Sequence, residues 1–180
     1  YPRVKSERNY NGFPQEFKVE VFDISESSWK QVATGTASPD VKGYVANPVR
    51  VPFDSTVAGR SVRITVTELG HADNAEEYAL QLAEIAVLGS ANIAPFAMIE
   101  AEQSTADWAQ QTWLGPEYLI DHVTSKDGGF YVSDTTAVAD TEKTIEFDFA
   151  NFYDMSEVIL YPRLKEESYN GFPQEYTIEV

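Results

Sequence analysis

The sequence predicts an all-β protein, a β-sandwich of the jelly-roll kind. Short segments in which apolar and polar residues alternate recur along the chain, as in strands with one buried face. Turns rich in glycine, proline, serine and aspartate separate these segments. No segment has the apolar spacing of a convincing amphipathic helix. Many short strands joined by such turns are typical of a sandwich or a barrel.

The first half of the chain contains the clearest strand signals. Every second residue is apolar in residues 16–22 and again in residues 61–67. A shorter strand begins at Trp29, whose indole we expect in the core. Residues 44–53 contain two prolines, which confine this segment to a sheet edge or a bulge. Residues 78–89 are apolar enough for a strand that is buried on both faces.

The second half begins after Gly89-Ser90, where the strand pattern is interrupted. We place a boundary between residues 89 and 90. Residues 143–149 alternate, and residues 156–162 are predicted to be their pairing partner. The chain closes on another alternating segment, residues 176–180.

A duplication determines the organisation of the chain. Residues 1–21 and 161–180 share Tyr-Pro-Arg and Tyr-Asn-Gly-Phe-Pro-Gln-Glu, and fourteen of twenty aligned positions are identical. The period is about 160 residues, the size of a whole domain. We therefore predict that residues 1–89 are the C-terminal half of one repeat and that residues 90–180 are the N-terminal half of the next.

This organisation raises the question of how each half is completed. If the two halves close on each other, the two copies of the duplicated block compete for the same strand position, and one copy is displaced. A displaced strand is a donor for exchange with a neighbour. Because Gly89 to Asn92 leaves little linker, we expect completion by neighbouring copies rather than closure within one chain.

Composition excludes several classes of function. Thirteen lysines and arginines against 29 acidic residues give a net charge of −16, which argues against nucleic acid and anionic membrane lipid as partners. There is no cysteine, and no serine-hydrolase elbow, zinc-protease motif or phosphate loop. We predict that the chain is not an enzyme. The acidity suits an extracellular or cell-surface module, or serves only to keep the surface soluble.

The ordered set of motifs resembles the coagulation factor 5/8 type C, or discoidin, domain. In residues 90–180 the motifs NIAP, LIDHVTSKDGGFYVS, TIEFDF, VILYPR and GFPQEYTIEV are similar to its first half. In residues 1–89 the motifs YPR, GFPQEFKVEV, PVRVPF, SVRITVTEL and LQLAEIAVLG are similar to its second half. The GFP-containing motif and the acidic composition are most similar to those of bacterial members of the family, which include carbohydrate-binding modules of family 32. The resemblance implies a discoidin-like jelly-roll sandwich with its halves in permuted order.

The resemblance also implies a non-catalytic module that binds glycan through loops at one end of the sandwich. The arginine and asparagine that contact sugar hydroxyls in that family match Arg163 and Asn170, and Arg3 and Asn11 in the other copy. Fixed planar donors suit this task. The alternatives are a structural ion pair for each arginine and turn chemistry for each Asn-Gly.

Further ligand candidates are His71 in a polar loop, Tyr78, and the two tryptophans Trp108 and Trp113. The alternative for the histidine is a solvated loop residue, and for the aromatic residues it is packing.

A structural calcium ion is the cofactor that the resemblance implies. Asp121, Asp127 and Glu84 match its ligand positions, although His122 stands where the family usually has glycine. Calcium takes six to eight oxygen ligands, including carbonyls. The alternative is that the two aspartates cap turns with their side chains.

We thus expect a carbohydrate-binding module, repeated in a large secreted or surface-anchored bacterial protein, with glycan and neighbouring repeats as partners. The alternative is a structural repeat of a fibrous surface protein or adhesin, assembled by domain stacking or strand exchange.

Overall fold

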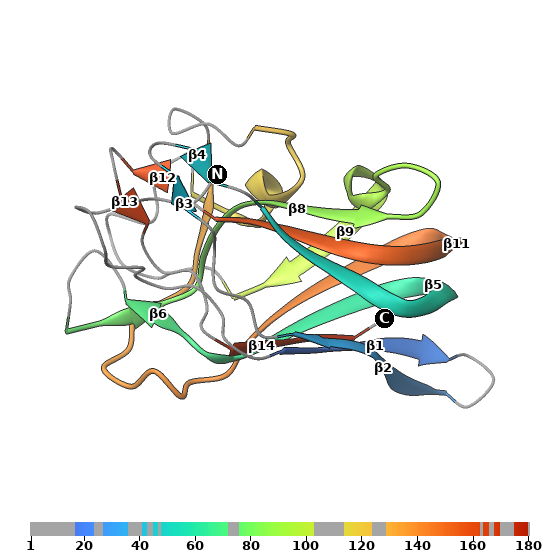
Figure 1. Ribbon diagram of the computed structural model, residues 1–180, viewed down its shortest axis with the longest axis horizontal. Coiled ribbons are helices and arrows are strands. Elements are labelled where there is room, and N and C mark those ends of the chain that lie inside the picture. Colours follow the sequence, from blue (N-terminus) through green and yellow to red (C-terminus); the bar gives the residue numbers. More distant parts are fainter. Residues whose placement is uncertain are drawn as a thin grey trace.

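The computed structural model is built almost entirely from antiparallel strands (Figure 1). It describes residues 17–23, 27–35, 41–42, 45–46, 48–71, 76–102, 114–123, 129–162, 164–165, 168–169 and 175–179. Within these ranges there are two short 3₁₀ helices and no α-helix. The all-β prediction is therefore confirmed.

The large sheet contains eight strands in the order β1-β2-β14-β5-β11-β8-β10, with β9 on the other edge of part of β11. Its strands are β1 (Phe17–Asp23), β2 (Ser28–Gly35), β5 (Val49–Glu68), β8 (Gln81–Leu88), β9 (Ala97–Ala101), β10 (Tyr131–Val132), β11 (Lys143–Pro162) and β14 (Glu175–Glu179). The 3₁₀ helices are η2 (Ala94–Phe96) and η4 (Pro116–Leu119).

Three two-stranded ladders lie at the left end of the view in Figure 1. They are β3 (Val41–Lys42) with β4 (Val45–Ala46), β6 (Gly70–His71) with β7 (Tyr78–Ala79), and β12 (Leu164–Lys165) with β13 (Ser168–Tyr169).

The large sheet folds over on itself into two facing layers, because its two longest strands bend together. β5 and β11 each have 20 residues, and they pass from one layer to the other at the right of Figure 1. Their register shifts at the bend: Asp148 lies opposite Ser61, and the next pair is Tyr153 with Gly59. The extra residues on β11 are a large bulge, which lets a strand turn sharply without losing its partner.

This bend corrects one strand assignment. We expected residues 156–162 to pair with residues 143–149, but both segments belong to β11, and both pair with β5. The first segment pairs with residues 61–66 in one layer, and the second with residues 49–52 in the other. The prolines behave as predicted, since Pro52 lies in a part of β5 whose only described partner is β11.

The two halves of the sequence close on each other within one chain. β11, from the second half, pairs with both β5 and β8 from the first half. Pairing within one chain thus joins the two halves, and completion by neighbouring copies stays a prediction. The short connection suffices because Asn92 Oδ1 accepts hydrogen bonds from the backbone N–H groups of Val87 and Ala94, at 3.2 and 3.1 Å, which stabilises a tight turn after β8.

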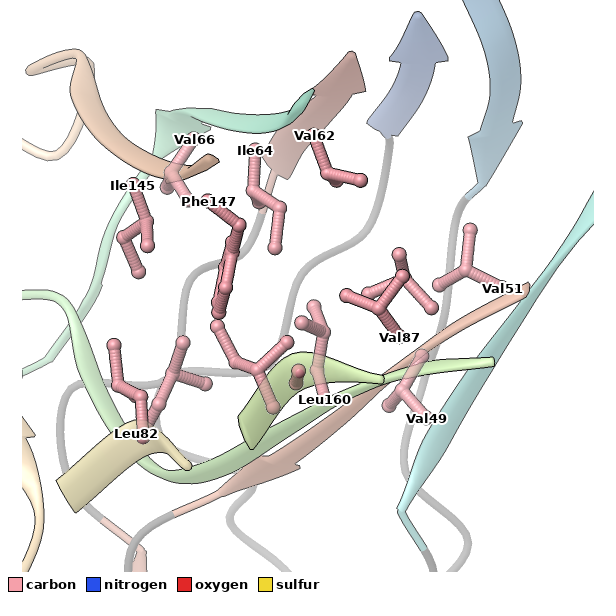
Figure 2. Packing of buried hydrophobic residues seen from close by; sticks show 14 of the residues in the cluster. Val49, Val51, Val62, Ile64, Val66, Leu82, Val87, Ile145, Phe147 and Leu160 are labelled. Atoms are coloured by element: carbon pink, nitrogen blue, oxygen red, sulfur yellow. The ribbon is translucent and has the colours of Figure 1, made fainter. Parts of the chain in front are cut away.

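The core lies between the two layers. Alternate residues of the second part of β5 and the first part of β11 point inward, as their sequence pattern predicts, and β8 is buried on both faces from Gln81 to Val87. Figure 2 shows the two sets of side chains facing each other: Val62, Ile64, Val66, Ile145 and Phe147 from one layer, and Val49, Val51, Leu82, Val87 and Leu160 from the other.

We predict that Phe147→Ala lowers the free energy of unfolding by about 3–5 kcal/mol, because it leaves a cavity between the layers. Phe147 is fully buried, whereas Phe152 on the same strand is 59% exposed. Phe152→Ala is the matched control and should change stability by about 0.5 kcal/mol or less. Urea denaturation measures both. Equal losses in the two variants would contradict the assignment of the core.

Candidate functional site

Aromatic and charged side chains gather on the outer face of the layer that contains β2, β5, β9 and part of β11. The alternation that sends Val62, Ile64 and Phe147 into the core sends their neighbours outward. The strand registers then line these neighbours up in rows. One row runs Glu100, Glu146, Arg63, and the next runs Met98, Asp148, Ser61.

A hollow of about 280 Å³ lies on this face. It is lined by Phe22, Trp29, Arg60, Ser61, Met98, Glu100, Glu146, Phe147 and Asp148. The lining thus includes three aromatic residues, of which Phe147 is fully buried, together with an exposed thioether, an exposed guanidinium group, a hydroxyl group and three carboxylates. None of these residues is among the ligands predicted from the sequence.

Trp29 does not lie in the core, contrary to our expectation. Its side chain is half-buried on the outer face, where the ring meets the edge of Phe22 at 5.3 Å between centroids. The guanidinium carbon of Arg63 lies 4.0 Å from the centre of the indole ring. The register places Trp29 opposite Phe22, next to the loop that joins β1 to β2. A ring between an aromatic edge and a cation is held in one orientation.

The polar groups of the hollow are also held in place. Arg63 Nε donates to Glu146 Oε1 at 2.7 Å, and Ser61 Oγ donates to Asp148 Oδ1 at 3.1 Å. Both pairs join β5 to β11 across the sheet. The Arg63 and Glu146 side chains are 27% and 39% exposed, so their ion pair contributes little to stability. Their lone pairs and protons remain within reach of a ligand from solvent.

A second group of polar side chains surrounds Glu84, the one acid in the buried strand β8. Glu84 is 3% exposed, and its Oε2 accepts a hydrogen bond from the backbone N–H of His122 at 2.9 Å. The His122 ring nitrogen Nδ1 lies 3.6 Å from Glu84 Oε1. Asp121 forms a side-chain hydrogen bond with Glu84, and its other contact is with the N–H of Val123 at 2.8 Å.

Burial raises the pKa of Glu84 from 4.5 to about 8, and the negative charge of Asp121 adds to the rise. The hydrogen bond from the His122 N–H opposes it. His122 has a φ of 64°, the left-handed conformation that glycine adopts without steric cost.

This group fits a divalent cation in part. Two of the three predicted ligands, Glu84 and Asp121, are brought together, and the buried acid retains its proton to a high pH in place of a neutralising cation. Asp127 lies outside the described residues. Within the described part of the chain, no cluster of three or more acidic, histidine or cysteine side chains forms a metal site. Two carboxylates together with backbone carbonyls are oxygen donors of the kind that calcium prefers.

The predicted glycan ligands fall into two groups. His71 and Tyr78 lie opposite each other in the β6–β7 ladder. Tyr78 is half-buried and packs against the core, and its backbone exchanges two hydrogen bonds with Thr136 at 2.7 and 2.9 Å. The other predicted residues lie outside the described part of the chain: Arg3, Asn11, Trp108, Trp113, Arg163 and Asn170.

No protein-family model, characterised protein or solved structure matches the chain. Among the residues that the structure describes, no helix is long and apolar enough to span a membrane.

Glu84 generates a prediction for the pH dependence of stability. Between pH 4.5 and about 8 the folded state holds a proton that the unfolded state has lost, so the free energy of unfolding falls as the pH rises through this window. In the presence of EDTA, we expect Glu84→Gln to flatten this dependence, and Glu142→Gln, at an exposed site, to leave it unchanged. Urea midpoints at pH 5 and pH 8.5 measure it. A Glu84→Gln profile parallel to that of the original protein would contradict the assignment.

Proposed function

We propose that this protein is a non-catalytic glycan-binding module, and that the glycan binds in the hollow beside Trp29. The observation that supports the proposal is the combination of an oriented indole, a guanidinium group and three carboxylates in one hollow on a rigid sheet face. A jelly-roll fold of the discoidin kind is part of the proposal, and the two antiparallel layers are consistent with it. An extracellular or cell-surface location follows from a glycan ligand.

The chemistry of the hollow suits a sugar ring. The apolar C–H face of a pyranose packs on an aromatic ring, while its hydroxyls donate to carboxylates such as Glu146 and Asp148 and accept from guanidinium groups. A hollow of about 280 Å³ is at the lower limit of pockets for drug-sized ligands, about 300–1,000 Å³. We therefore expect recognition of one sugar unit, such as a chain end or branch, rather than a long stretch of polymer.

The surrounding strands explain why this site needs little rearrangement on binding. Ser61 and Asp148 of the hollow already form a hydrogen bond across β5 and β11, and Glu146 accepts one from Arg63, which does not itself line the hollow. These rotamers are therefore ordered before a ligand arrives. Preordered groups reduce the entropy cost of binding. The site proposed from the family resemblance, with Arg163 and Asn170, lies at a different place in the sequence and is a separate arm of the test below.

We also propose that Glu84 and Asp121 hold a structural calcium ion. The ion would replace the proton on Glu84 and would attach the segment that contains Asp121 to β8. Its role would be structural, since Glu84 is buried and neither residue lines the hollow.

Trp29→Ala should weaken glycan binding at least tenfold, about 1.4 kcal/mol, because it removes the platform of the hollow. Phe96→Ala is the matched control: Phe96 is 66% exposed but does not line the hollow, and its loss should leave affinity unchanged. A glycan array identifies the ligand, and titration calorimetry measures the affinity.

Two variants make this test decisive. Asp148→Asn keeps the shape of the hollow while changing its charge, and should also weaken binding. If Arg163→Ala abolishes binding while Trp29→Ala and Asp148→Asn do not, the glycan binds at the loop site that the resemblance implies. If no glycan on the array binds, the proposed function is wrong.

Calcium should raise the melting temperature of the protein. Stabilisation by a ligand that binds only the folded state is about 2.7 kcal/mol at a hundredfold excess over Kd. We expect Glu84→Gln and Asp121→Asn to remove the calcium-dependent increase, and Glu142→Gln to retain it. Differential scanning calorimetry with and without calcium measures the effect. An equal increase in all variants would place the ion elsewhere, and no increase in the original protein would exclude the site.

A further inference from the structure

The two copies of the duplicated segment have the same backbone partners on β2. The equivalent pairs are as follows: Val19 of β1 and Ile178 of β14 both lie opposite Ala33, and Glu20 of β1 and Glu179 of β14 both lie opposite Gln31. Both registers shift at the same place, directly after the pair with Ala33. The similarity between the copies thus extends from sequence to sheet register.

The two copies also have the same backbone partner on β5. Glu20 of β1 lies opposite Arg63 of β5, and Glu179 of β14 also lies opposite Arg63. These two glutamates are the equivalent residues when the duplicated segments are aligned. Sequence alignment and the β5 register therefore both identify β1 and β14 as equivalent strands, and their registers on β2 agree with this.

A single strand position cannot hold two strands. At Arg63, one edge of β5 is paired with Glu146 of β11, so only the other edge is left for β1 and β14. That edge offers one row of backbone donors and acceptors, and a row that is paired with one strand has none left for another. β1 and β14 are therefore alternative occupants of one position between β2 and β5, which we call the shared slot. When one of them fills the slot, the other has a matching sequence but no position left between β2 and β5.

We propose that the shared slot is exchangeable: it takes β1 or β14 of its own chain, or β14 of a second copy of this chain. The occupant is specified by the sequence, because only a chain with this duplicated segment carries a strand that matches the slot. An insertion between chains makes the same contacts as one within a chain, as in domain swapping. A strand left outside the sheet has unpaired edges, which favours pairing with another molecule.

The length of the loop that connects each copy to the slot determines which copy fills the slot within a chain and which is available to a neighbouring chain. Between Asp23 of β1 and Ser28 of β2 there are only four residues, so β1 reaches the slot as one arm of a hairpin. β14 has no such short connection to β2 or β5. A short loop loses less entropy on closure than a long one, so β1 has the advantage within a chain. β14 is then the copy that is available to a neighbour, most of all where copies are linked and their local concentration is high.

Two proline substitutions test this proposal in the full chain. Proline cannot donate to a sheet ladder, so Val19→Pro excludes β1 from the slot and Ile178→Pro excludes β14. With one slot, each single variant retains a strand that can fill it and should unfold in urea near the original midpoint. The double variant should lose far more than the sum of the two losses, or fail to fold. Additive losses would mean that each strand has its own place, and would overturn the proposal.

A labelled peptide tests insertion between chains. A fluorescein-labelled peptide of residues 169–180 should bind the double variant at least tenfold more tightly than the original chain, whose slot is filled from within, and should raise its urea midpoint. A peptide with the same composition in scrambled order is the control. If neither protein binds the peptide above the scrambled control, strand exchange between copies is excluded. This result does not depend on glycan binding, so the two proposals can fail separately.

Discussion

The pairing of β11 with both β5 and β8 is the constraint on which the rest of the structure depends. β11 comes from the second half of the sequence, and β5 and β8 come from the first, so these two pairings make the longest connection between the halves in the sheet. Its bend with β5 also makes the two layers and sets Phe147 against the core residues of the opposite layer. Segments far apart in the sequence can form this ladder because it requires only an adjacent strand with correct direction and register, whatever its place in the chain.

Much of the fold could be predicted from the residues alone. The period-two pattern in residues 61–67 and 143–149 indicates which side chains are buried, because one face of each strand must be apolar. It carries no information about which strands are neighbours. Arg63 and Glu146 are far apart in the sequence, and nothing local shows that they lie opposite each other. The hollow is a product of that register and was therefore missed.

Trp29 and Glu84 show how residue type can mislead or inform. A large aromatic residue at a strand start usually packs inward, but Trp29 lies beside the loop of the β1–β2 hairpin, where it packs against Phe22 on the outer face. Glu84 is the opposite case. An acid in a strand that is apolar on both faces conflicts with its surroundings, and such a conflict often marks a functional residue. This signal was present in the sequence before any resemblance was considered.

Arg63 connects the shared slot with the hollow. Its Nε donates a hydrogen bond to Glu146, and its guanidinium group lies over the indole of Trp29. Arg63 thus links the polar and the apolar parts of the site. On the slot side it lies opposite a glutamate from either copy, Glu20 or Glu179. The register at Arg63 is thus the same whichever copy fills the slot. An exchange of strands between neighbouring chains would keep this register at Arg63. It would also take Phe22, which belongs to β1, away from Trp29 and the hollow, so assembly and ligand binding are coupled through this layer of the protein.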